Sequence, residues 1–123
     1  MFRSVLKSKI HRATVTDADL HYEGSISIDA NLMKAAGLLP HEHVHVWDVT
    51  NGNRLETYTL EAPAGSGTIC INGAAAHLAK KGDLVIITNF VWLPEEEAAR
   101  HEPTVILVDQ NNQMVKKSNS PIS

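Results

Sequence analysis

Hydrophobic and polar residues alternate along much of the chain, a pattern typical of strands that bury one face. The clearest example is a pair of alternating runs, V-H-V-W-D-V and R-L-E-T-Y-T-L, joined through Asn51-Gly52. Asn and Gly tolerate the positive φ of tight hairpin turns, so we predict a hairpin from about Val44 to Leu60. Apolar runs predict further strands over residues 5–15, 68–71, 84–93 and 104–109.

Two short helices interrupt the predicted strands. In the first, Asp29 is placed as an N-cap, an apolar stripe follows, and Gly37 ends the helix. The stripe consists of Leu32, Met33 and Ala36. In the second, residues 73–83 read G-A-A-A-H-L-A-K-K-G-D, with lysines near the end and Gly82 after them. The segment 94–103, P-E-E-E-A-A-R-H-E-P, is interpreted as a charged connection.

Five or six strands with two short helices predict a mainly β fold of one domain. The helices are too short and too few for a parallel sheet with crossover helices, so a small closed or nearly closed mixed barrel fits better. The 123 residues suffice for one core and not for two. We expect the barrel over residues 1–109 and a polar, flexible tail over residues 110–123, whose composition is poorly suited to packing.

The composition indicates which cellular compartment and which binding partners to expect. The formal net charge of −3 gives no field that would gather nucleic acid or an anionic membrane, so neither is an expected partner. The single cysteine, Cys70, cannot form an intrachain disulfide, and charged residues interrupt the N-terminal apolar positions of any secretory leader. A cytoplasmic location is therefore expected. A chain this small builds a deep pocket more easily between subunits than within one, which favours an oligomer.

Seven histidines raise the question of a metal site, and three of them, His41, His43 and His45, would share one face of a strand. A zinc site needs three or four converging ligands, usually from separate segments, and the sequence shows no distant partner for this triple. A solvated histidine face is the favoured interpretation, and no metal is predicted. A metal-dependent hydrolase built on these histidines is kept as one alternative function.

The dipeptide Gly24-Ser25 lies in an otherwise strand-like run and, taken alone, is most often a turn. It gains meaning from an ordered set of motifs. These are K-I-H-R-A at 9–13, D-A-D-L-H-Y-E-G-S at 17–25, V-T-N-G-N-R-L-E-T-Y at 49–58, I-N-G-A-A-A-H at 71–77 and K-G-D-L-V-I-I at 81–87. From about Arg3 to Val108 the chain resembles the pyruvoyl-dependent aspartate α-decarboxylase (aspartate 1-decarboxylase) family. It departs from the family pattern at Ile26, a position that supplies no reacting atom.

The resemblance implies a six-stranded double-psi β-barrel with short helices that assembles as a homotetramer, with active sites between subunits. It also implies a proenzyme that cleaves itself between Gly24 and Ser25 and turns Ser25 into a covalent pyruvoyl group, without pyridoxal phosphate. The Ser25 hydroxyl would attack the Gly24 carbonyl while the Thr57 hydroxyl stabilises the oxyanion. We expect glycine at position 24 because a residue without Cβ admits strained backbone angles. Whether maturation needs a helper protein stays open.

The implied activity is decarboxylation of L-aspartate to β-alanine and carbon dioxide, for pantothenate and coenzyme A synthesis. Arg54 and Lys9 would hold the two carboxylates, because a guanidinium binds a carboxylate bidentately and an ammonium adds a second charge. Tyr58 would donate a proton to the carbon left behind. Thr57 and Tyr58 point to opposite faces of a strand, so both reach one site only through local twist or a subunit contact. The other implied residues are Asn72, Gly73, Ala74 and Ala75 against the substrate, and His11, Tyr22 and Trp47 as pocket walls.

The main alternative is a non-catalytic small β-barrel that binds or assembles with partners. In that case the polar patches are ordinary surface, and Lys9 and His11 form a solvated strand face. The two hypotheses differ in the covalent state of the chain. A decarboxylase of this kind is cut before Ser25, whereas a binding module stays intact.

Overall fold

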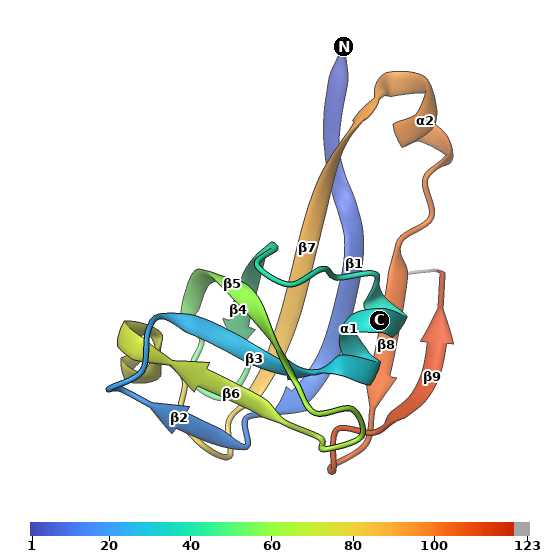
Figure 1. Cartoon of the computed structure of the whole chain (residues 1–123). Helices are drawn as coiled ribbons and strands as arrows, with labels where there is room; N and C mark the ends of the chain where they lie inside the picture. The colour runs from blue at the N-terminus through green and yellow to red at the C-terminus, as the bar shows by residue number, and fades with distance from the viewer. Residues whose placement is uncertain (120–123) are drawn as a thin grey trace.

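The computed structural model describes residues 1–119, which form mostly strands (Figure 1). The elements in chain order are β1 (Phe2–Thr14), β2 (Asp17–Asp19), β3 (Ser25–Asp29), α1 (Ala30–Ala36), β4 (His43–Asp48), β5 (Arg54–Ala62), β6 (Ile69–Asn72), the 3-10 helix η1 (Gly73–His77), β7 (Leu84–Pro94), α2 (Glu95–Arg100), β8 (Thr104–Val108) and β9 (Met114–Ser118). The predicted mainly β class with short helices is confirmed.

The strands form one mixed sheet in the order β2-β6-β3-β5-β4-β7-β1-β8-β9. Pairing is antiparallel except for β1 with β8, β3 with β5, and β2 with β6. The β1–β2 connection turns back onto distant parts of the chain, because the backbone N–H of Val15 donates to Asp83 and that of Thr16 donates to Ile69, both at 2.8 Å. The sheet therefore curls on itself, as expected for a nearly closed mixed barrel, while β1 and β7 extend beyond it as a long ribbon (Figure 1).

One face of the curled sheet forms the core. Ile10 of β1, Ile87 of β7 and Val46 of β4 pair across the three strands and are almost fully buried. Side chains alternate along a strand, so the neighbouring row, which contains Lys9 and His45, lies on the opposite, outer face. This alternation decides which functional residues can share a surface.

Two local predictions are confirmed. The hairpin forms at Gly52, which has a φ of 80°, and the helix α1 ends at Gly37, which has a φ of 71°. At the start of α1 the Asp29 side chain accepts a hydrogen bond from the backbone N–H of Asn31 at 2.8 Å. Both glycines adopt the left-handed conformation that side chains with a Cβ disfavour.

Two predictions in the C-terminal part were wrong. The segment taken as a charged connection contains α2, which starts after Pro94 and carries three glutamates in its first turn, where they complement the helix dipole. The polar tail contains β9, and Asn112 before it is buried and donates to the carbonyls of Thr14 and Gly67 at 2.8 Å. The predicted tail therefore has regular structure over residues 110–119, where β9 pairs with β8, although Asn112 is its one buried residue there; the rest of it, residues 120–123, lies outside the described part of the chain.

Over residues 1–119, none of the helices has the length and apolar character needed to span a membrane.

A buried carboxyl stabilises the β4–β5 turn. Asp48 accepts hydrogen bonds from the backbone N–H groups of Thr50 and Asn51, at 2.8 and 3.1 Å, and is only 3% exposed. Burial, and next the neighbouring Asp83 carboxyl, raise the pKa of Asp48 to about 6. An unfolded aspartate has a pKa of about 3.9, so the folded state binds the extra proton and its stability falls as the pH rises between these values.

We expect Asp48→Asn to raise the free energy of unfolding by about 1 kcal/mol at pH 7.5, less than the full pKa shift because Asp83 shares the proton, with little gain at pH 4.5. Asparagine keeps the turn acceptor and removes the buried charge. Denaturant unfolding at both pH values measures the effect. The control is Asp109→Asn, an exposed aspartate that caps the turn at Asn111 in the same way. Equal or lower stability of Asp48→Asn at pH 7.5 would contradict the assignment.

Candidate active site

Ser25 is the first residue of β3 and is fully buried. Its antiparallel partner on β6 is Asn72, whose Nδ2 donates to Ser25 Oγ at 2.9 Å and to Ser27 Oγ at 3.2 Å. The Ser25 hydroxyl itself points toward the carbonyl of Glu23, at 3.4 Å. A buried hydroxyl that accepts a hydrogen bond is held in one orientation and is shielded from water.

The backbone of Gly73, directly after Asn72, packs against the peptide that precedes Ser25. Gly73 has a φ of 73°, and a Cβ placed there would lie 2.7 Å from both the N and the Cα of Gly24, and 3.0 Å from the Tyr22 carbonyl oxygen. Only glycine fits this position, because any other residue combines an unfavourable φ with a backbone clash. The end of β6 therefore holds the Gly24–Ser25 segment in place.

The expectation of a strained glycine at position 24 was wrong. Gly24 is absent from the glycines with positive φ, and a Cβ added to it would meet nothing within 4 Å. The steric constraint belongs to Gly73, its partner in the contact. The sequence shows that Gly24 and Gly73 both lack a Cβ, but it does not show which of the two would clash if it carried one.

Strand register places Tyr58 on the same face as Ser25. Ile26 on β3 pairs with Thr59 on β5 in a parallel ladder, so one residue earlier Ser25 comes level with Tyr58, and Gly24 with Thr57. Tyr58 is 36% exposed, whereas Thr57 is half-buried on the core-facing side opposite Val44. The expected opposition of Thr57 and Tyr58 is thus observed.

Arg54 and Trp47 form a second cluster on the outer face. They pair across β4 and β5, and the Arg54 guanidinium lies 4.6 Å from the centre of the Trp47 ring. Arg54 lies on the same face of β5 as Tyr58, because the two residues are four apart on one strand. Arg54 and Trp47 line a hollow of about 350 Å³ together with His45, Leu55, Glu56 and Phe90.

Lys9 and His11 lie far from Ser25 within one chain. They are on β1, and the sheet order places four strand spacings between β1 and β3. At about 4.8 Å per spacing this is roughly 19 Å measured along the curved outer face. Burial, followed by the charges of Lys9 and Arg12, lowers the pKa of His11, and its buried Nδ1 has no hydrogen-bond partner within residues 1–119.

The remaining predicted residues surround the Ser25 cluster. Tyr22 is exposed, and its carbonyl oxygen faces Gly73. Ala74 is exposed and Ala75 half-buried, both on η1, which begins immediately after Asn72. Sequence reasoning missed Ser27, the second hydroxyl bound by Asn72. Its spacing of two residues from Ser25 on a strand was the available signal.

Comparison with known proteins identifies the family. The family model described as aspartate decarboxylase matches residues 1–115. The chain belongs to the aspartate decarboxylase family. The resemblance seen in the sequence motifs is thereby confirmed.

Curated relatives in this family match almost the whole chain. A protein named aspartate 1-decarboxylase from Dehalococcoides mccartyi is 57% identical, over 97% of this chain and 96% of its own. Proteins of the same name from Myxococcus xanthus and Legionella pneumophila (strain Lens) are 59% and 58% identical, over 94% and 92% of this chain and 88% and 85% of theirs. Among solved structures, the computationally designed protein msDPBB_sym2 is similar with a TM-score of 0.42 and 19% identity, over 69% of this chain and 96% of that chain.

We expect Gly73→Ala to destabilise the protein more than the same change at another glycine with the same φ. The control is Gly37→Ala, whose φ of 71° matches the 73° of Gly73 but whose added Cβ would meet nothing within 4 Å. Gly37→Ala should cost about 1 kcal/mol through its φ alone, and Gly73→Ala about 1–3 kcal/mol more through the clash with Gly24. Denaturant unfolding measures both. Equal losses would show that Gly73 and Gly24 are not in contact.

Proposed function

We propose that this protein decarboxylates L-aspartate to β-alanine and carbon dioxide, using a pyruvoyl group that it makes from its own Ser25. Membership of the aspartate decarboxylase family supports the reaction. One observation carries the proposal for Ser25. Its buried hydroxyl accepts a hydrogen bond from Asn72 Nδ2 at 2.9 Å, and the backbone of Gly73 packs against the preceding residue, Gly24. A surface serine in a binding module would need neither contact.

Self-cleavage begins with the Ser25 hydroxyl. Oγ attacks the carbonyl carbon of Gly24, an ester bond forms as the amide C–N bond breaks, and the hydroxyl proton passes to the Ser25 nitrogen. Asn72 donates to Oγ and so stabilises the negative charge that develops on it as the proton leaves. Thr57, level with Gly24 on the adjacent strand, suits the role of donor to the carbonyl oxyanion.

The second half of the cleavage releases the N-terminal piece. Elimination across the Cα–Cβ bond of residue 25 expels the Gly24 carboxylate and leaves a dehydroalanine, and water then hydrolyses its imine tautomer, releasing ammonia and leaving a ketone. No oxidant is required, since only water is consumed. Burial of Ser25 slows premature attack of water on the ester.

The residues around Ser25 fit a pyruvoyl group. The group contains only atoms already at residue 25 plus one oxygen, which takes the place of the Ser25 nitrogen on Cα, and Asn72 Nδ2 lies beside this residue as a hydrogen-bond donor. When formed, a pyruvoyl ketone supplies an electron sink for loss of the substrate α-carboxylate, without pyridoxal phosphate. The surrounding chain binds and orients the amino acid and excludes water.

Recognition of aspartate falls to the outer face of the sheet. Arg54 binds a carboxylate bidentately, and Trp47 beneath its guanidinium keeps the side chain flat against the sheet. Tyr58 lies level with Ser25, four residues from Arg54 on the same face of β5, and can donate a proton to the carbon that loses the carboxylate. Asn72, Gly73 and Ala74 offer polar backbone and small side chains beside the reacting atom.

The spread of these residues supports active sites shared between subunits of a homotetramer. Aspartate is far shorter than the roughly 19 Å of sheet between Lys9 and Ser25 on one chain, so Lys9 and His11 would come from a neighbouring chain. The unpaired Nδ1 of His11 is then free for a group on that chain or its substrate. Phe2 and Trp92, 61% and 68% exposed on the β1–β7 ribbon, offer apolar surface for assembly.

We further propose a cytoplasmic enzyme that supplies β-alanine for pantothenate and coenzyme A synthesis. The single cysteine, half-buried on β6, agrees with a reducing compartment.

Replacing Ser25 tests the proposal against a closely matched control. We expect Ser25→Ala to stay at full length and to release no β-alanine, because alanine has no nucleophilic oxygen. Ser27→Ala, which removes the other hydroxyl bound by Asn72, should still cleave and turn over. Intact-mass measurement should show residues 1–24 and 25–123 as separate pieces in the native protein and in Ser27→Ala. Cleavage or β-alanine release by Ser25→Ala would refute the mechanism.

A further inference from the structure

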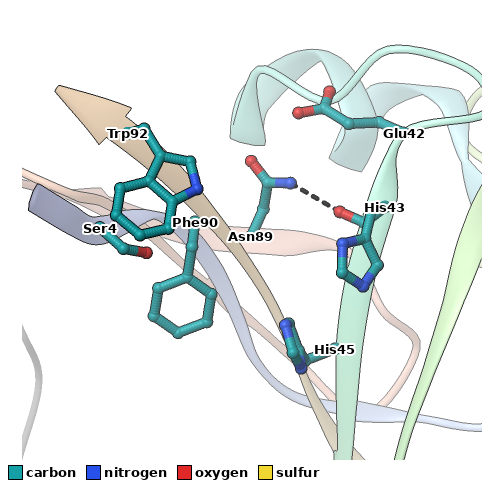
Figure 2. A pocket seen from close by; sticks show the side chains of 7 residues that line it. All are labelled: Ser4, Glu42, His43, His45, Asn89, Phe90 and Trp92. Atoms are coloured by element: carbon teal, nitrogen blue, oxygen red, sulfur yellow. Dashed lines mark hydrogen bonds between the residues drawn. The ribbon is translucent and has the colours of Figure 1, made fainter. Parts of the chain in front are cut away.

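A group of metal-binding side chains lies on the outer face of the β4–β5 hairpin. His43 and His45 are two residues apart on β4, so both side chains project to the same side of the sheet, as the sticks in Figure 2 show. Glu56 on β5 lies directly opposite His45 and diagonally from His43. Directly opposed and diagonal neighbours on one face of a sheet are within reach of long side chains. Three ligands from two strands therefore meet at one place.

The three side chains already converge. His43 Nε2 lies 2.8 Å and His45 Nε2 3.8 Å from Glu56 Oε1, and one ligand atom of each residue lies within 4.8 Å of the others. Ligand atoms about 2.0–2.2 Å from Zn²⁺ are roughly 3.3–3.6 Å apart in a tetrahedron. Small rotations about the side-chain bonds are enough to bring these atoms into that range.

Neighbouring contacts hold the His45 ring and the His43 backbone in place. The Phe90 ring packs edge-on against His45, with centroids 5.4 Å apart and planes at 89°. Asn89 Nδ2 donates to the carbonyl of His43 at 2.7 Å, which fixes β4 against β7 (Figure 2). A hollow of about 500 Å³ beside the histidines leaves room for water molecules on an ion. These features favour binding, since less side-chain freedom is lost when the ion arrives.

We propose that His43, His45 and Glu56 form a binding site for a divalent transition-metal ion such as Zn²⁺, with its remaining positions filled by water. Two imidazoles and one carboxylate suit zinc, copper and nickel, whereas magnesium and calcium prefer oxygen ligands alone. The proposed ion takes no part in the steps proposed at Ser25, although His45 and Glu56 line the same hollow as Arg54 and Trp47. The site lies on the same face of β5, between the positions of Arg54 and Tyr58.

The sequence alone predicts no metal site, because it places His41 on one strand face with His43 and His45 and offers this triple no partner from another segment. His41 in fact precedes β4, has a φ of 69°, and places its ring 6.3 Å from that of Tyr58. The partner from another segment is Glu56, which the register of the hairpin supplies.

Calorimetric titration of ZnCl₂ into the untagged full-length protein tests the site. We expect saturable binding of one ion per chain, and a rise in melting temperature with added zinc, because an ion that binds only the folded state stabilises it. His45→Gln and Glu56→Gln should each weaken binding more than about tenfold, since each removes a direct ligand. Glu56 is exposed, so its variant should fold normally, and the melting curve without metal checks this for both.

Two controls separate this site from other zinc-binding groups. His41→Gln changes a histidine in the same segment that is outside the cluster, and Cys70→Ser removes the one thiol, whose pKa is raised by burial and by Asp17 and Asp19. Both should bind zinc as the native protein does, and MgCl₂ should not compete. Absence of saturable binding, binding unchanged in His45→Gln and Glu56→Gln, or equal competition by magnesium would each overturn the proposal.

Discussion

The close approach of two glycines is the contact on which the candidate active site depends. The Gly24 backbone occupies the space that a Cβ on Gly73 would fill, and this close approach brings the end of β6 against the start of β3. The contact places Asn72 over the Ser25 hydroxyl and buries that hydroxyl completely. In the proposed cleavage, this packing brings the nucleophile, its donor and the peptide bond together before the reaction begins, which avoids the entropy cost of assembling them later.

Strand register then distributes the other functional side chains. Because the core occupies one face of the curled sheet, the outer face is available for polar chemistry, and Tyr58, Glu56 and Arg54 follow one another along β5 on that face. The separation of the strands, rather than the direction of the side chains, keeps Lys9 away from Ser25 within one chain. Lys9 is on β1, four strand spacings from β3, which starts at Ser25. An assembly in which a second chain supplies Lys9 resolves this separation, and the same outer face carries the hairpin cluster proposed to bind metal.

Features set by neighbouring residues in the chain could be predicted from the sequence, and features set by distant contacts could not. The Asn51-Gly52 turn and the cap by Asp29 follow from local backbone chemistry, and both were found as expected. Strand β9, which pairs with β8, was missed because its residues are mostly exposed and lack an apolar pattern, and the turn before it is held by Asn112, whose partners are far away in sequence. The motifs led to the family and to Ser25. The steric need for glycine was expected at Gly24 but is found at Gly73, because the sequence of neither segment shows that the two backbones touch.

The central claim is that residue 25 becomes a ketone through cleavage of the bond before it. The most direct test is the mass of the fragment 25–123 from active protein before and after treatment with borohydride. The account predicts a gain of two hydrogen atoms, located by fragmentation at residue 25, with loss of activity in step with the reduction. An active protein that remains one chain, or whose fragment is unchanged by borohydride, would contradict it.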